Sequence, residues 1–328
     1  MHPARQVIGP ITLVTSDLAK SAMFYVKGIG LEVPGKAPKR PKDKIVGELP
    51  LAEQWRMEDE FRERLKKLAT VEIELRRAGK RSPQRPSILR LGNGANDLVA
   101  LELQPTAKHA GWTTGLFHMA ILLPSRKALA RQLKHFIDSK IPIQGASDHG
   151  VSEAIYLSDP DGNGIEIYAD RPREAWVYRG GLLFMPTLPL DVDQLLKELD
   201  DQDEPWRGIP AGAVMGHIHL RVSDLPAAEA FYHEIIGMDV TARYDDEATF
   251  MSFDGYHHHL GLNTWESKGK PPAPEGSIGL KYFQINLADD SAPERVKSTA
   301  QKNGVPFEQT PHGISLRDPS GNVVILHA

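Results

Sequence analysis

The residues with the clearest chemical potential lie between positions 149 and 166, where a histidine, a tyrosine and a glutamate are combined with the signals of a β-hairpin. Residues 151–158 alternate apolar with small or polar side chains, as a strand with one buried face does. Residues 159–164 are rich in glycine, proline and asparagine, which favour a turn, and the alternation then resumes. Glu166 stands between two isoleucines on the return strand, where a carboxylate costs free energy unless it is paired or bound to a metal. An edge strand that lets Glu166 reach solvent is the alternative interpretation.

This stretch resembles the active-site signature of the extradiol ring-cleavage dioxygenases, which belong to the vicinal oxygen chelate superfamily. The signature is a histidine, a short spacer, an aliphatic–tyrosine pair, Asp-Pro-x-Gly and a glutamate. The matching residues here are His149, Ile155, Tyr156, Asp159, Pro160, Gly162 and Glu166. Ser147 departs from the pattern, since glycine or a few other residues are usual two positions before the histidine. The resemblance implies that Glu166 is an iron ligand and that His149 and Tyr156 assist catalysis without binding the metal.

The resemblance also implies two histidine ligands, because two histidines and one carboxylate form a facial triad that holds Fe(II) and leaves positions open. In this superfamily the first-strand ligand precedes the helix-capping aspartate by seven residues, which selects His217 before Asp224. His219 points to the same side of that strand and is the alternative. His118, in the first strand of the module that supplies Glu166, takes the corresponding position. A hydrogen-bonded histidine of the core is the simpler interpretation of His118 taken alone.

A run of three histidines at 257–259 precedes a further predicted strand. In the extradiol enzymes a histidine two residues before an aliphatic–small pair acts as the acid–base catalyst, and the pair Leu260-Gly261 implies His258 for this role. A shift of one residue would select His257 or His259, whose side chains point to the opposite face.

Two internal repeats indicate how these residues are positioned. Residues 16–25 resemble 223–232, each with an aspartate suited to N-capping followed by an amphipathic helix, and residues 156–163 resemble 315–322. The superfamily plan then implies an α+β fold of four tandem βαβββ modules, which form two open, barrel-like domains. The predicted modules are roughly 6–105, 114–170, 214–266 and 278–328.

We expect an N-terminal domain over 1–172, a linker with a short helix over 173–213, and a C-terminal domain over 214–328. Module one contains an insertion at 36–90, in which dense mixed charge and strong helix formers predict a helix from about 51 to 78. A solvated helix on the flank of the barrel is the simpler interpretation of this insertion, and a subunit contact or a lid is the alternative.

The four modules are unequal in ligand-type residues. Modules two and three carry the implied ligands, whereas modules one and four retain only Glu102, so we predict no metal there. The resemblance therefore implies that modules two and three work as a pair, with one interior metal site where the two halves of the chain meet.

The composition is that of an ordinary globular protein, with 41% hydrophobic and 25% charged residues. A net charge of −4 without a basic stripe makes nucleic acid an unexpected partner, and no apolar run is long enough to cross a membrane. The N-terminus lacks the apolar core of a signal peptide, so we expect a cytoplasmic protein. The absence of cysteine rules out disulfides and leaves histidine and carboxylates as metal ligands.

The resemblance implies non-haem Fe(II)-dependent extradiol (meta) cleavage of a catechol-type aromatic diol with O₂, giving a ring-opened semialdehyde. Mn(II) suits the same donors, and homo-oligomer formation is left open. The alternatives are a hydroquinone-type ring-cleaving dioxygenase, a glyoxalase-like isomerase or lyase, and a non-catalytic small-molecule binding protein of the same fold. A glyoxalase-like enzyme would add a carboxylate ligand from the position that Gly261 holds in module three.

Overall fold

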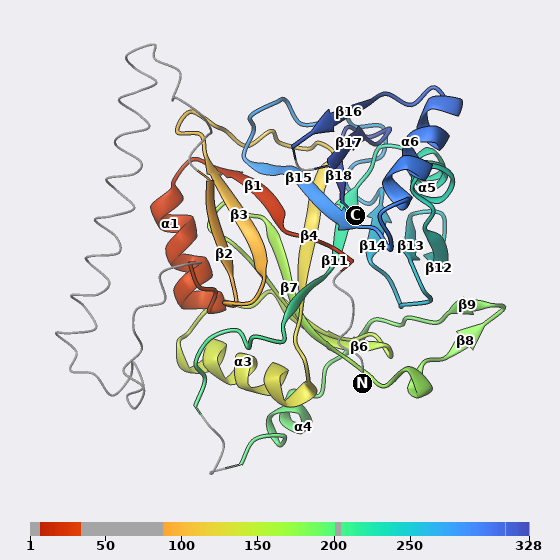
Figure 1. The fold of residues 1–328 in the computed structure, drawn as a ribbon. Helices are drawn as coiled ribbons and strands as arrows, with labels where there is room; N and C mark the ends of the chain where they lie inside the picture. Colours follow the sequence, from red (N-terminus) through yellow and green to blue (C-terminus); the bar gives the residue numbers. More distant parts are fainter. Residues whose placement is uncertain (1–6, 34–87, 201–204, 312, 328) are drawn as a thin grey trace.

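The computed structural model describes residues 7–33, 88–200, 205–311 and 313–327, and within them strands outnumber helices (Figure 1). Module one contains β1 (Ile11–Thr15), α1 (Leu18–Met23), η1 (Phe24–Ile29), β2 (Ile88–Gly92) and β3 (Asp97–Leu103). Module two contains β4 (Gly115–Leu122), α3 (Arg126–Asp138), β5 (Gly145–Asp148), β6 (Ser152–Ser158) and β7 (Gly164–Asp170). The linker contains η3 (Arg173–Ala175), β8 (Tyr178–Arg179), β9 (Leu182–Leu183), β10 (Leu188–Pro189) and α4 (Val192–Leu196). Module three contains β11 (Val214–Arg221), α5 (Leu225–Ala230), η4 (Phe231–Ile236), β12 (Asp239–Tyr244), β13 (Ala248–Ser252) and β14 (Leu260–Asn263). Module four contains β15 (Gly279–Asn286), α6 (Ala292–Lys302), β16 (Phe307–Thr310), β17 (Gly313–Arg317) and β18 (Val323–His327).

The described strands form two large, curved sheets and one small hairpin (Figure 1). Modules two and three, together with β10 of the linker, build a nine-stranded sheet in the order β10-β5-β6-β7-β4-β11-β14-β13-β12. Modules one and four build a seven-stranded sheet in the order β16-β17-β18-β15-β1-β3-β2. At the centre of the larger sheet β4 runs antiparallel to β11, while β7 and β14 lie parallel to β4 and β11 on their outer sides. The two modules therefore meet along β4 and β11.

The predicted α+β fold of repeated modules is confirmed. Each large sheet takes strands from both sides of the linker, and the division into domains at 1–172 and 214–328 stays a prediction. A short helix, α4, lies in the linker where one was expected and is capped by the side chain of Asp191. The helix predicted over 51–78, with most of the insertion at 36–90, lies outside the described residues.

The repeated helices begin and end in the same way. The carboxylates of Asp17 and Asp224 each accept the backbone N–H three residues further on, at 3.0 Å, which satisfies a free donor of the first turn. Both helices then widen into a π-helical turn, η1 or η4. Gly30 and Gly237 end them in the left-handed region, with φ of 92° and 90°, which only glycine adopts without strain.

Two buried tyrosines explain why the Asp-Pro-x-Gly turn occurs twice. The hydroxyl of Tyr25, on η1 of module one, donates to Asp159 in the turn of module two at 2.8 Å. Tyr232, on η4 of module three, donates to Asp318 in the turn of module four at 3.1 Å. Burial raises the pKa of both tyrosines, so each hydroxyl keeps its proton and stays a donor. The contacts connect module one to module two and module three to module four.

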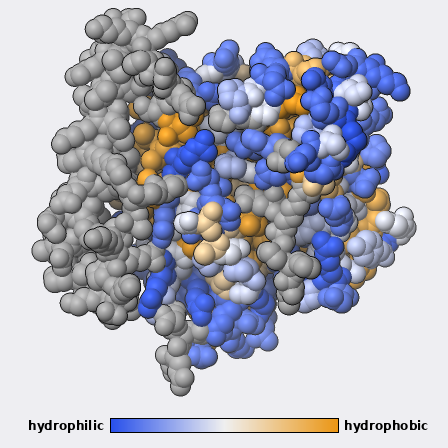
Figure 2. Space-filling view, viewed as in Figure 1, coloured by the Kyte–Doolittle hydropathy of each residue, from blue (hydrophilic) through white to orange (hydrophobic). Residues whose placement is uncertain are grey.

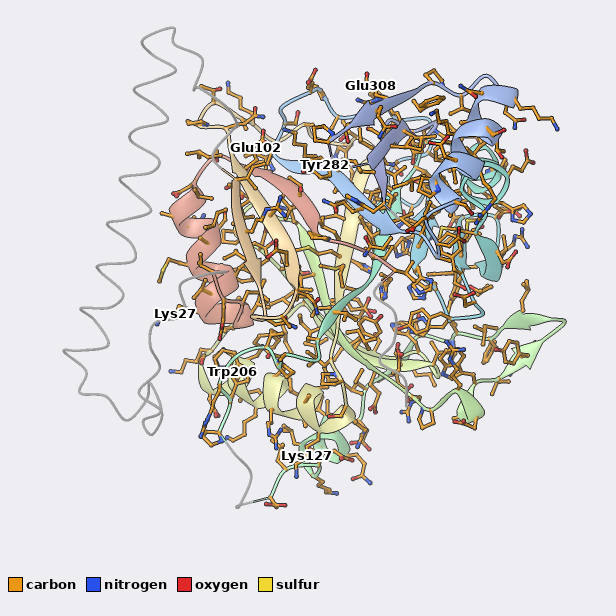
Figure 3. All side chains as sticks on the ribbon, viewed as in Figure 1. Lys27, Glu102, Lys127, Trp206, Tyr282 and Glu308 are labelled. Carbon is orange, nitrogen blue, oxygen red and sulfur yellow. The ribbon has the colours of Figure 1, made fainter. Side chains whose placement is uncertain are left out.

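The seven-stranded sheet carries its own buried acid. Figure 3 shows Glu102 on β3, and its carboxylate lies 2.5 Å from the ammonium group of Lys281 on β15. An ion pair of this kind neutralises a buried carboxylate. Glu102 is therefore satisfied by a lysine.

The face shown in Figure 2 is largely hydrophilic, with apolar areas between hydrophilic residues. In the part of the chain that the structure describes, no helix is both long enough and apolar enough to span a membrane.

Replacing Tyr25 with phenylalanine should lower the free energy of unfolding by about 1–3 kcal/mol, because the buried Asp159 loses one donor. Urea denaturation followed by circular dichroism measures the change. Tyr178→Phe is the matched control, since that side chain is 58% exposed. Equal stabilities of the two variants would contradict the role of this contact.

Candidate metal centre

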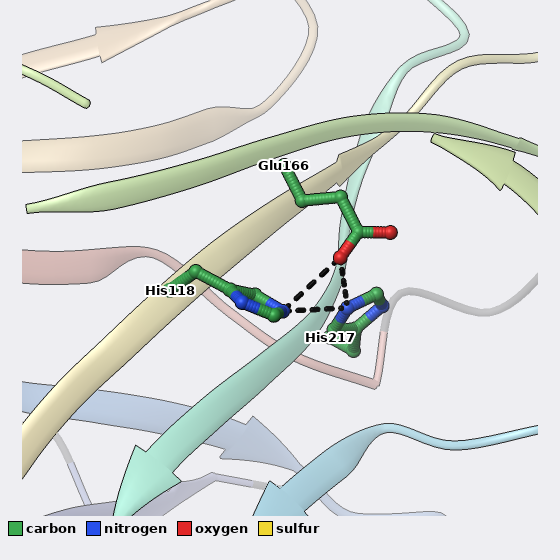
Figure 4. Close-up of side chains that lie close together, drawn as sticks. All are labelled: His118, Glu166 and His217. Carbon is green, nitrogen blue, oxygen red and sulfur yellow. Dashed lines mark hydrogen bonds and ion pairs between the residues drawn. The ribbon is translucent and has the colours of Figure 1, made fainter. Parts of the chain in front are cut away.

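The structure brings His118, Glu166 and His217 together, with their ligand-type atoms facing one another (Figure 4). The Oε2 atom of Glu166 lies 3.1 Å from His118 Nε2 and 3.2 Å from His217 Nε2, and the two nitrogens are 3.4 Å apart. All three residues are buried, with exposures of 8%, 3% and 1% for His118, Glu166 and His217. Among the described residues they are the one group of at least three His, Cys, Asp or Glu side chains placed to share an ion.

The strand register explains this convergence. Ala120 on β4 pairs with Glu166 on β7 at one side and with His217 on β11 at the other. His118 precedes Ala120 by two residues, so all three side chains leave the same face of the sheet. Ala120, which lies between them in the sheet, carries only a methyl group on this face.

The geometry of the three atoms fits a first-row divalent metal. Nitrogen and oxygen ligands lie about 2.0–2.2 Å from such an ion, so neighbouring ligand atoms around it are roughly 3.0–3.4 Å apart. The separations of 3.1, 3.2 and 3.4 Å agree with this spacing.

The electrostatics favour the protonation states that bind a metal. Burial lowers the pKa of His217 to about 4, so its imidazole is neutral near pH 7. Burial also acts to raise the pKa of Glu166, but His217 and His118 outweigh that effect and hold this pKa well below its ordinary value. The Glu166 carboxylate and the neutral His217 imidazole face His118 Nε2, so a cation between the three residues would satisfy their lone pairs together.

His219, the alternative ligand, makes a different contact. It lies two residues beyond His217 on the same buried face, but its Nε2 atom is 3.0 Å from the side-chain amide of Asn263. The His219 ring also lies over Gly261, where an added Cβ would be only 2.8 Å from two of its ring atoms. The position from which a glyoxalase-like enzyme would supply a carboxylate is thus covered by this ring.

His149 and Tyr156 form a hydrogen-bonded pair beside the triad. The Tyr156 hydroxyl lies 2.7 Å from His149 Nε2, and His149 Nδ1 lies 2.9 Å from the carbonyl oxygen of Pro186. Since a carbonyl only accepts, His149 Nδ1 carries the proton, and neutral His149 accepts the tyrosine O–H at Nε2. Tyr156 pairs with Glu166 across β6 and β7, which places its ring 5.8 Å from that of His118.

An arginine holds the loop that carries His149. The guanidinium group of Arg171 bonds to Asp148 at 2.6 Å and to Glu153 at 3.1 Å, on either side of the loop. The backbone N–H of Gly150 also donates to Asp148 at 2.9 Å. The loop is therefore fixed at both ends.

Of the three consecutive histidines, the structure places His258 on the wall of the pocket beside the triad. Its ring lies 4.1 Å from that of His217, and burial lowers its pKa well below the ordinary value. His257 is fully buried behind it, and His259 accepts the backbone N–H of Phe253 at 3.2 Å.

The pocket lined by His118, His149, Tyr156, Glu166 and His258 has a volume of about 250 Å³ and a largely apolar wall. The apolar wall comes from separate elements and consists of Phe117, Val151, Met185, Tyr244, Phe250 and Trp265. Trp265 packs edge-to-face on Phe117 at 5.3 Å and is 45% exposed, which places it at the entrance. None of these wall residues was predicted from the sequence. Only Phe117 is adjacent to a predicted site residue, and the others are brought to the pocket by the fold.

Residues 7–167 and 214–326 match the model of the family described as the Glyoxalase/Bleomycin resistance protein/Dioxygenase superfamily. The chain therefore belongs to this superfamily. It is the vicinal oxygen chelate superfamily, which the sequence motifs indicated.

Within it, the chain is 42% identical over 237 residues to a catechol-2,3-dioxygenase of Bacillus subtilis (strain 168), an alignment that covers 71% of this chain and 82% of that protein. This similarity supports membership of the extradiol dioxygenase family.

Two crystal structures share the fold at low identity. One is of a protein from Bacillus subtilis subsp. subtilis str. 168, with a TM-score of 0.55, 12% identity, and coverage of 98% of this chain and 84% of that one. The other is glyoxalase I from Zea mays, with a TM-score of 0.52, 15% identity, and coverage of 98% and 91%. At these identities, both similarities show the fold alone.

The variants Glu166→Ala and His217→Ala should each lose the bound metal after reconstitution, because each removes one of three converging ligand atoms. Metal content after gel filtration, measured by mass spectrometry, checks this. His219→Ala is the matched control and should keep one metal per chain. Loss of metal in His219→Ala with full retention in His217→Ala would reverse the assignment of these two histidines.

Proposed function

We propose that the protein is a non-haem Fe(II)-dependent enzyme that cleaves the ring of a catechol-type diol with O₂, next to its two hydroxyl groups. The observation that carries this proposal is that His118, Glu166, the His149–Tyr156 pair and His258 line a single pocket, with His217 grouped with His118 and Glu166. The identity of 42% to a catechol-2,3-dioxygenase supports it.

The three ligand-type residues would hold the ion from one side and leave its pocket side open. When bound, Fe(II) supplies open coordination positions for a diol and O₂ and a path for electrons between them. Mn(II) suits the same donors.

The Tyr156–His149 pair is arranged to accept a proton from the diol. Tyr156 donates its own proton to His149 Nε2, so a lone pair of its oxygen remains for a substrate hydroxyl. A proton taken up by Tyr156 passes on to His149, whose Nδ1–H is held by the Pro186 carbonyl. These hydrogen bonds thus carry the proton from the substrate, through Tyr156, to His149.

His258 lies in the segment between β13 and β14 and packs against His217 and Phe250, so it contacts the pocket from the module-three side. It would take up the proton of the second diol hydroxyl at Nε2 and return that proton when the O–O bond breaks. Both oxygen atoms of O₂ enter the product, so the ring-opened semialdehyde contains the atoms of the diol plus O₂. The proton passed to His149 is the one that the carboxylic acid group of the product gives up.

The pocket wall favours an uncharged ring. Among the described residues that line it, none is lysine or arginine, so a carboxylate on the substrate would find no partner. A cavity of roughly 150 Å³ accommodates benzene. The larger volume of about 250 Å³ leaves room for a small apolar substituent.

Anaerobic reconstitution with Fe(II), followed by catechol and air, tests the function. We expect one O₂ consumed for each yellow, ring-opened product formed. For 3,4-dihydroxybenzoate we expect kcat/KM at least about 100-fold lower than for 4-methylcatechol, because a buried charge without a partner costs several kcal/mol. Iron bound without oxygen uptake on any catechol would contradict the proposed reaction.

His258→Ala should retain iron and bind catechol but lose most turnover, by roughly 100-fold or more, because the proton donor is absent. Oxygen consumption and metal content are measured on the same preparation. His233→Ala, on the partly buried η4 helix away from the pocket lining, is the control for histidine removal. Wild-type turnover in His258→Ala would remove His258 from the reaction.

A further inference from the structure

Behind His258, on the side away from the pocket, a chain of hydrogen bonds leads to a carboxylate. His258 Nδ1 lies 2.8 Å from His257 Nδ1, and His257 Nε2 lies 2.9 Å from Asp170 Oδ1. His257 is 0% exposed and does not line the pocket. Asp170 is the last residue of β7, the strand that carries Glu166, so the chain of bonds crosses from module three to module two.

The directions of these bonds follow from what each group can do. An ionised carboxylate only accepts, so His257 donates its Nε2–H to Asp170. A neutral imidazole that donates at Nε2 accepts at Nδ1, so His258 must donate its Nδ1–H to His257. His258 in its neutral form therefore carries no proton on Nε2, and that nitrogen is the one left for the pocket.

We propose that Asp170 and His257 are positioning residues that fix the ring orientation and the tautomer of His258. The inference rests on the proposed function, because it concerns the proton donor of that reaction. Fixed in this way, His258 takes up a proton at Nε2 and returns it from the same atom, while Nδ1–H stays bonded to His257.

Asp170 is itself held in place for this task. The Tyr256 hydroxyl donates to the same Oδ1 atom at 3.0 Å, and the Tyr168 hydroxyl lies 2.8 Å from that of Tyr256. Because Tyr256 donates to Asp170, its oxygen accepts the O–H of Tyr168. The ring of Trp176 packs on His257 at 5.5 Å and limits its rotation.

The arrangement has the logic of an aspartate that sets the tautomer of a catalytic histidine. In the serine-protease template, exchanging that aspartate for asparagine keeps the geometry but selects the wrong tautomer. Here an amide N–H at position 170 would donate to His257 Nε2. His257 would then donate from Nδ1 to His258 Nδ1. Neutral His258 would carry its proton on Nε2, so this atom could not take up a proton from the substrate.

The kinetic test compares Asp170→Asn with Asp170→Glu in the iron-loaded enzyme, with catechol and O₂ as substrates. We expect kcat to fall by roughly 100-fold in Asp170→Asn, while KM and iron content stay within about two-fold. Asp170→Glu keeps an accept-only group and should recover most of that loss. Asp239→Asn, at an exposed position of β12, is the matched control and should behave as wild type.

Wild-type kcat in Asp170→Asn would overturn the proposal. Equal losses of kcat and iron in both Asp170 variants would also overturn it, since that result indicates a structural role alone.

A second readout separates this inference from the proposed reaction. Nitrogen-15 spectra of histidine-labelled protein distinguish protonated from bare ring nitrogens, and Asp170→Asn and His257→Gln assign the signals. We expect a proton on Nδ1 of His258 in the wild type and on Nε2 in Asp170→Asn. If no catechol is turned over but these tautomers are found, the reaction fails and the positioning stands. The same tautomer in both proteins would refute the positioning.

Discussion

The antiparallel pairing of β4 with β11 is the constraint on which the rest of the site depends. It places His217 beside Ala120 while β7 places Glu166 on the other side of the same alanine. A carboxylate buried between two imidazoles is stabilised by their N–H groups or by a cation that the three residues share. The fold thus holds three lone-pair donors at a spacing that suits a metal, and it does so with residues from two modules.

The four modules have different functions within one repeated plan. In modules one and four, Glu102 is balanced by Lys281, so that sheet satisfies its buried acid by itself. The Tyr25–Asp159 and Tyr232–Asp318 contacts connect neighbouring modules in the same way in both halves. The modules thus share the contacts that hold the fold, whereas the candidate chemistry is confined to the sheet of modules two and three.

Local patterns predicted much of this arrangement. The alternation around Glu166 and the repeated Asp-Pro-x-Gly turn indicated buried hairpins, and the helix caps at Asp17 and Asp224 indicated where the repeats begin. The choice of His217 over His219 required a family spacing, since both face the same side of β11. Their environments separate them, because the ring of His219 occupies the space over Gly261. The pocket wall and the bond from Asp170 to His257 depend on contacts between residues far apart in the chain, which no periodicity reveals.

The assignment of the three metal ligands can be tested by a crystal structure of the protein loaded anaerobically with Fe(II), with an anomalous difference map at the iron edge. We expect one peak per chain, within about 2.0–2.4 Å of His118 Nε2, His217 Nε2 and Glu166 Oε2. A peak bound instead by His219 or His258, or no peak between these three residues in iron-loaded crystals, would contradict it.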